Sequence, residues 1–251
     1  MESTKANLFF ARAVALVEGD AENLLLPVIG DKVKCSFSEN GVSVVNVGHT
    51  GLFRYSRIFQ RQAGDAVVPI RVACVRDFDV APDSASDGMK GGLKKWGDYT
   101  DAERAQRREN MADGDAEPVR SFISDFWTFE YDLARSSWRT ARIMHKAIRS
   151  AALTKPLEKK NEWPSEADIK AAQEAADAEV DAWEAADADR EAVALAIYEP
   201  LRIGGVSKAI AAQFAADLVT DSDLELADLP PYLRYALTYL CPPEEEDGAT
   251  A

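Results

Sequence analysis

The sequence has few of the residues that mark secreted, zinc-binding or membrane proteins. It holds three cysteines and two histidines in 251 residues, and the cysteines lie far apart. This spacing matches neither a zinc motif nor the disulfide framework of a small secreted domain. No apolar run is long enough to cross a membrane, and the first residues are polar and unlike a signal peptide. We therefore expect a cytoplasmic protein with no membrane partner.

A second absence concerns nucleotide hydrolysis. The sequence contains no Gly-x-x-x-x-Gly-Lys-Ser/Thr loop, so we expect no ATP binding or hydrolysis by that route. Basic residues are in the minority, with 29 Lys and Arg against 43 Asp and Glu and a net charge of −14. This balance argues against a polyanionic partner unless positive charge is concentrated locally.

Acidic residues follow two apolar segments of strand length. Residues 14–17 precede Glu18, and residues 72–75 lead to Asp77 and Asp79. Apolar runs that end in polar turns are typical of central strands in a sheet covered by helices. Such strands place their functional residues at the carboxyl edge of the sheet.

Glu22 joins this group because it lies in the first turn of a helix expected from Asp20, where it can point back toward Glu18. Clustered carboxylates repel one another, and a divalent cation is one of the usual ways to hold them together at neutral pH. The sequence therefore predicts a site for Mg²⁺ or a similar hard cation.

The order of these motifs resembles the Toprim domain, which topoisomerases, bacterial primases and several nucleases share. Its signature is one Glu after the first strand and Asp-x-Asp after the third, and residues 42–48 supply the intervening strand. The resemblance implies an α/β fold, with a central, mostly parallel sheet flanked by helices. An α-helical insertion domain would be added to this Toprim domain.

Four segments resemble the overcoming-lysogenisation-defect (OLD) family of nucleases. Residues 16–27 are similar to its Leu-Val-Glu-Gly-x-x-Glu-x-x-Leu-Leu-Pro motif, and residues 42–55 to its second strand and turn, with His49 in place of a Gly. Residues 127–134 resemble its Thr-Leu-Glu-Tyr-Asp-Leu-Ala segment. Residues 206–215 resemble its Lys-Gly helix, with Ala209 in place of the Gly.

This resemblance implies a metal-dependent DNA endonuclease that uses two divalent cations, Mg²⁺ or Mn²⁺. It also implies that the chain is the C-terminal part of an ATPase-nuclease, whose N-terminal ABC-type ATPase domain would be a partner absent from this chain. The alternative is a non-catalytic nucleic-acid-binding or regulatory Toprim module. By the family pattern the catalytic residues are Glu18, Asp77 and Lys208, and the metal ligands are Glu18, Glu22, Asp77, Asp79, Glu130 and Asp132.

Positive charge is concentrated in two places near these motifs, where it could bind the DNA backbone. One group is Lys90, Lys94 and Lys95, followed by Arg104, Arg107 and Arg108; the other is a helical stripe that begins with Arg135, Arg139 and Arg142. Either group could equally be a solvated helix face. Residues 165–192 carry ten acids and are expected to form a helix with a solvated acidic face.

These observations divide the chain into four parts. We expect a Toprim core over residues 8–155, with a mobile excursion at 81–118, and an acidic helical insertion over 156–203. Helices over 204–241 are expected to return to the core, and residues 242–251 to form a disordered tail.

Overall fold

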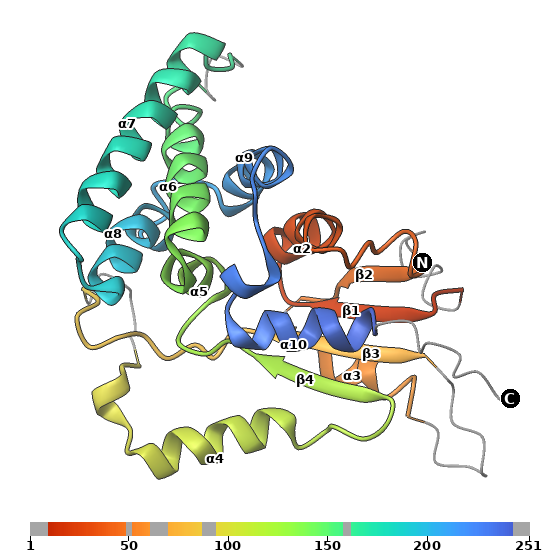
Figure 1. Ribbon diagram of the computed structural model, residues 1–251. Coiled ribbons are helices and arrows are strands. Elements are labelled where there is room, and N and C mark those ends of the chain that lie inside the picture. The colour runs from red at the N-terminus through yellow and green to blue at the C-terminus, as the bar shows by residue number, and fades with distance from the viewer. Residues whose placement is uncertain (1–9, 49–51, 61–69, 87–93, 158–161, 243–251) are drawn as a thin grey trace, which may run out of the picture.

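A four-stranded parallel sheet lies at the centre of the molecule (Figure 1). The structure is a computed structural model that describes residues 10–48, 52–60, 70–86, 94–157 and 162–242. The strands are β1 (Ala13–Val17), β2 (Val42–Asn46), β3 (Arg71–Arg76) and β4 (Val119–Ile123), in the order β2-β1-β3-β4. All three strand pairs are parallel, which confirms the predicted α/β class.

The apolar runs that predicted β1 and β3 are explained by their central position. Every residue of β1 is buried, because the strand has a neighbour on each side and helices over both faces. Successive side chains point to opposite faces. Ala13, Ala15 and Val17 join the larger of two hydrophobic clusters, whereas Val14 and Leu16 join the smaller.

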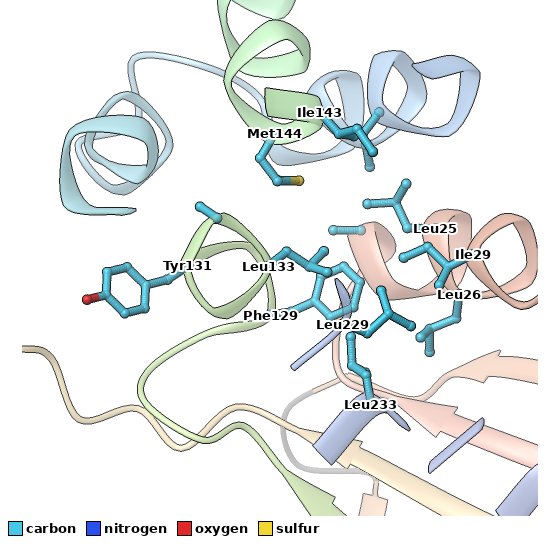
Figure 2. Close-up of a cluster of buried hydrophobic side chains, with 14 of the residues drawn as sticks. Leu25, Leu26, Ile29, Phe129, Tyr131, Leu133, Ile143, Met144, Leu229 and Leu233 are labelled. Carbon is cyan, nitrogen blue, oxygen red and sulfur yellow. The ribbon is translucent and has the colours of Figure 1, made fainter. Parts of the chain in front are cut away.

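The face with the larger cluster carries most of the helices (Figure 1). Figure 2 shows how Leu25, Leu133 and Leu233, from three different helices, converge above the sheet. This layer fixes the helices that approach the carboxyl edge of the strands. Its helices are α2 (Asp20–Lys32), α5 (Phe129–Ser136), α6 (Trp138–Ala152), α7 (Glu166–Ala185), α8 (Arg190–Arg202), α9 (Lys208–Thr220) and α10 (Pro231–Leu240), with the 3-10 turn η4 (Leu226–Asp228) before α10.

The opposite face is covered by shorter elements. The short helix α3 (Leu52–Ser56) places Leu52 in the smaller cluster. The segment after β3 contains the 3-10 turn η2 (Trp96–Asp98) and helix α4 (Asp101–Ala112), where the sequence suggested a mobile excursion.

Three arginines that the sequence offered as a DNA contact or a solvated helix face instead attach α4 to η2 and to the segments that follow β3 and β4. Arg104 donates to the carbonyls of η2 and its C-cap, and Arg107 donates to the Phe78 carbonyl at 3.2 Å. Arg108 donates to the Ser124 and Asp125 carbonyls at 2.9 and 2.6 Å. The described part of the excursion is therefore folded, and these guanidiniums are engaged with backbone oxygens.

Two helices expected to be continuous are each divided. Ser137 ends α5 and caps α6, with its hydroxyl accepting from the Thr140 N–H at 3.1 Å. Asp189 caps α8 in the same way through the Ala192 N–H at 2.9 Å, so the predicted helix over 165–192 is split into α7 and the start of α8. Short polar residues compete for backbone N–H groups, and this competition begins a new helix.

Cys35 and Cys241 form a disulfide, a pairing that the sequence did not indicate. The bond joins the end of α10 to the loop between α2 and β2 across 206 residues of sequence. Cys74 is free and buried within β3, as expected for a small apolar side chain. Among the described helices, none combines the length and the hydropathy needed to cross a membrane.

Candidate functional site

Carboxylates from four elements gather at the carboxyl edge of the sheet. Glu18 follows β1 and Asp77 follows β3, and these strands are adjacent and parallel, as predicted. Asp79 lies two residues beyond Asp77, and Glu22 and Glu130 come from the first turns of α2 and α5. We refer to Glu18, Glu22, Asp77, Asp79 and Glu130 as the acidic cluster.

Glu22 bends back toward the start of its own helix, as the sequence predicted. Its Oε2 lies 2.8 Å from the position that a Cβ on Gly19 would occupy. A side chain at position 19 would therefore displace the Glu22 carboxylate from this position. Glu22 itself is 6% exposed.

The carboxylate of Asp77 reaches the N-terminus of α5. Its Oδ1 accepts a hydrogen bond from the Phe129 N–H at 2.8 Å, which fixes the side chain and satisfies a free N–H in the first turn of the helix. Asp79 is exposed and adopts φ 58°, a left-handed conformation that Asp tolerates better than most residues. The turn after β3 therefore gives the two aspartates different surroundings.

Lys208 brings a positive charge to the acidic cluster. Its Nζ lies 3.0 Å from Oε2 of Glu130, and the Glu130 side chain is 4% exposed. Lys208 is the first residue of α9, and its Nζ also lies 5.7 Å from the centre of the Tyr198 ring. The predicted catalytic lysine is thus in direct contact with a predicted metal ligand.

The electrostatics of the acidic cluster reflect burial and mutual repulsion. Burial, followed by repulsion from Glu130, raises the pKa of Glu22 from 4.5 to about 7, against the attraction of Lys208. The same two causes, in the same order, raise the pKa of Asp77 well above its usual value. Burial opposes the charge on Lys208, but attraction to Glu130 outweighs it and raises the pKa of Lys208.

Glu18 differs from the rest of the acidic cluster because an arginine neutralises it. Arg76 Nε lies 3.3 Å from Glu18 Oε1, and its Nη1 donates to the Met111 carbonyl at 2.6 Å. Burial raises the pKa of Glu18, although attraction to Arg76 lowers it in part. No role is predicted for Arg76 from the sequence, yet its position directly before Asp77 is the signal that could have identified it.

The acidic cluster has the chemistry of a divalent cation site. Carboxylate oxygens are the ligands that Mg²⁺ and Mn²⁺ prefer, and repulsion among buried carboxylates is relieved by a cation. Among the described residues, no three His, Cys, Asp or Glu side chains are arranged around one point as a formed ligand set. The carboxylate oxygens are of the kind that such an ion binds. Of these candidate ligands, Glu130 forms an ion pair with Lys208 in this structure.

The predicted metal ligand Asp132 is engaged with backbone N–H groups instead. Its two carboxylate oxygens accept hydrogen bonds from the N–H groups of Phe126 and Trp127, both at 3.0 Å. Burial raises the pKa of Asp132 to about 7, while these two bonds lower it in part. The side chain holds the loop between β4 and α5, which is a positioning role and not the predicted metal contact.

The predicted DNA-binding stripe on α6 faces the acidic helix α7. Arg142 lies 2.7 Å from Asp181, and Lys146 lies 2.9 Å from Asp177. Arg139, one turn earlier, pairs with Asp228. The stripe therefore forms an ion-pair seam between elements, in place of a free basic surface, while most acids of the 165–192 segment are exposed, as expected for a solvated acidic face.

The other predicted DNA contacts have separate outcomes. The guanidinium of Arg135 lies 3.5 Å from the centre of the Phe126 ring, beside the loop that Asp132 holds. Lys94 is exposed, and the Lys95 amino group donates to the Asp83 carbonyl at 3.4 Å. Lys90 lies outside the described residues.

A family model and several solved structures match this chain. Residues 9–79 match the Overcoming lysogenization defect protein-like, TOPRIM domain family, a range that includes four members of the acidic cluster. No curated protein matches the chain. The chain is similar to the C-terminal region of the Burkholderia pseudomallei OLD protein, with 24% identity over 92% of this chain and 98% of that chain, at a TM-score of 0.49.

The second solved structure is the C-terminal region of the Xanthomonas campestris pv. campestris OLD protein. It is 22% identical over 93% of this chain and 94% of that chain, with a TM-score of 0.49. These identities and TM-scores are too low to carry an argument about function. The likeness of residues 9–79 to the Toprim domain family therefore rests on the family model.

Proposed function

Since residues 9–79 match the OLD-like Toprim domain family, we propose that the chain is a metal-dependent DNA endonuclease. The observation that supports this most strongly is the placement of Glu22, Asp77 and Glu130 at the carboxyl edge of the sheet, with the Lys208 ammonium 3.0 Å from Glu130. This combines anionic metal ligands with a cation that can face a phosphate. The substrate class, DNA, comes from the family resemblance.

The chain's own residues have distinct tasks in this proposal. Glu18, Glu22 and Asp77 would hold a first Mg²⁺ or Mn²⁺ ion, and Asp79 and Glu130 would hold a second. The chemistry that such ions supply when bound is activation of water and stabilisation of the leaving oxygen. Asp77 enters this set already oriented by the Phe129 N–H, so its position costs little reorganisation.

Lys208 has the task of stabilising the charge that develops on the phosphate. Its ammonium is held by Glu130 and its side chain remains 45% exposed, so one side is accessible to a substrate oxygen. A preorganised cation of this kind contributes roughly 3 to 4 kcal/mol of transition-state stabilisation once a bound substrate excludes water from it. In the parent protein, we propose that an N-terminal ABC-type ATPase domain governs access to this site.

The proposal is tested with supercoiled plasmid in Mg²⁺, Mn²⁺, Ca²⁺ or EDTA. We expect nicking or linearisation with Mg²⁺ or Mn²⁺, none in EDTA, and loss of cleavage in Asp77→Asn and Lys208→Met. Glu166→Gln, in the exposed first turn of α7, is the matched control and should cleave normally. DNA binding without cleavage in every cation would favour the non-catalytic Toprim module instead.

A further inference from the structure

An aromatic pocket lies beside the acidic cluster and has no role in the chemistry described so far. Its volume is about 220 Å³, and it is lined by Pro82, Asp83, Trp96, Phe126, Tyr131 and Glu191. Trp96 and Phe126 are half-buried and lie 6.2 Å apart between ring centres. Flat, partly accessible rings of this kind are typical of platforms on which a nucleobase stacks.

Two residues that neighbour members of the acidic cluster in the chain, Phe78 and Tyr131, lie at the pocket. Phe78, between Asp77 and Asp79, has its ring 6.2 Å from that of Trp96. Tyr131 follows Glu130 directly in α5, and Figure 2 shows its side chain pointing away from Phe129; it is 1% exposed and belongs to the larger hydrophobic cluster. A strand whose phosphate lies at the acidic cluster would therefore have a neighbouring base near these rings.

Charge is arranged around the pocket in a way that suits a nucleotide. The guanidinium of Arg104 lies 4.6 Å from the centre of the Trp96 ring, and that of Arg135 lies 3.5 Å from the centre of the Phe126 ring. The two guanidiniums place positive charge against the rings of the pocket, where a phosphate backbone would pass. They also hold both rings in place by cation–π contact.

The two carboxylates supply hydrogen-bond acceptors at the pocket rim. Asp83 Oδ1 accepts from the Gly97 N–H at 2.6 Å, and Glu191 Oε1 accepts from the Ser84 hydroxyl at 2.7 Å. Each bond orients its carboxylate, and each carboxylate has a second oxygen that can accept. Carboxylates accept from exocyclic amino groups of bases, such as N4 of cytosine, whereas thymine has no such group.

We propose that this pocket binds one unstacked nucleobase of the substrate strand, next to the phosphate at the acidic cluster. Cytosine, adenine and guanine should be preferred over thymine there, because they carry an amino group that can donate to Asp83 or Glu191. The inference rests on the proposed function only in taking nucleic acid as the ligand. It assigns the site a base preference that a purely backbone-binding nuclease would lack.

The test measures binding of single-stranded oligonucleotides in EDTA by fluorescence anisotropy, with one abasic position moved along the strand. We expect one position at which loss of the base weakens binding by about 5- to 150-fold. Trp96→Leu should weaken binding of the intact strand to a similar extent and remove the sensitivity to that position. Trp96→Phe, which keeps a stacking ring, should restore most of it.

Trp163→Leu is the matched control, because Trp163 is 58% exposed and stacks on Phe214 instead of lining the pocket. The proposal would be overturned if Trp96→Leu and Trp163→Leu weakened oligonucleotide binding equally. It would also be overturned by an abasic scan with no sensitive position, or by equal affinity for thymine and cytosine at the sensitive position. If Trp96→Leu does not fold, the scan on the wild-type chain decides. The oligonucleotide test measures binding and does not depend on cleavage. If the chain leaves plasmid intact in Mg²⁺, the proposed nuclease activity is refuted, whereas the base-binding pocket is still decided by the anisotropy result.

Discussion

Replacing Glu22 by glutamine should stabilise the folded protein in the absence of divalent cations. The pKa of Glu22 is about 7 in the folded protein, against a usual value of 4.5. Because folding raises this pKa, ionisation of Glu22 costs stability; the cost is absent below the lower value and complete above the higher one. The difference between 7 and 4.5, at about 1.36 kcal/mol per pH unit, corresponds to about 3 kcal/mol.

Chemical unfolding in urea with EDTA, followed by circular dichroism at about pH 4 and about pH 8, measures this difference. We expect Glu22→Gln to match the wild-type chain at the lower pH and to exceed its free energy of unfolding by about 3 kcal/mol at the higher pH. Glutamine keeps the size of the side chain beside Gly19, so packing changes little. Mg²⁺ should stabilise the wild-type chain more than the variant, because it binds the ionised carboxylate.

Glu166→Gln is the control here too, since Glu166 occupies the first turn of α7 and is exposed. It should leave the pH dependence of unfolding unchanged. A Glu22→Gln chain that is less stable at both pH values, or a difference that does not grow with pH, would refute the account of burial and repulsion at this site.

Three further predictions concern Lys208, Arg142 and Cys241. Lys208→Met should bind Mn²⁺ several-fold more tightly, measured by isothermal titration calorimetry, because the lysine competes with the ion for Glu130. The same variant should cleave plasmid at least about 100-fold more slowly, because the lysine stabilises the transition state. A variant that loses Mn²⁺ affinity and cleavage rate to the same extent would contradict this. Arg142→Ala should lower the free energy of unfolding by about 1 kcal/mol without weakening DNA binding, since it pairs with α7; a large loss of DNA affinity would restore the stripe as a DNA surface. Cys241→Ser should lower stability by up to about 5 kcal/mol by chain entropy across 206 residues, measured under non-reducing conditions; no change would show that the bond is not formed.

The core of the fold could be predicted because its signals are local. The buried runs at 14–17 and 72–75 indicated central strands, and the Glu and Asp that follow them were placed at one edge by the geometry of parallel strands. The helix from Lys208 was predicted from residue pattern and is observed over Lys208–Thr220.

What the sequence could not supply is the pairing of distant segments. A basic stripe has the same periodicity whether it faces phosphates or an acidic helix, so the seam between α6 and α7 became visible only in the structure. The same holds for Cys35 and Cys241, which α10 brings together. Asp132 matched a family motif, but its direction depends on the turn at Phe126 and Trp127, which periodicity does not encode.

The most direct test of the central claim is the initial rate of plasmid nicking in Mg²⁺ by the wild-type chain and by Asp77→Asn. This substitution keeps the side chain's size and its bond to the Phe129 N–H while removing the charge that a cation needs. The account predicts Mg²⁺-dependent nicking by the wild-type chain and a loss of at least about 100-fold in the variant. Equal rates in the two chains, or nicking that persists in EDTA, would contradict it.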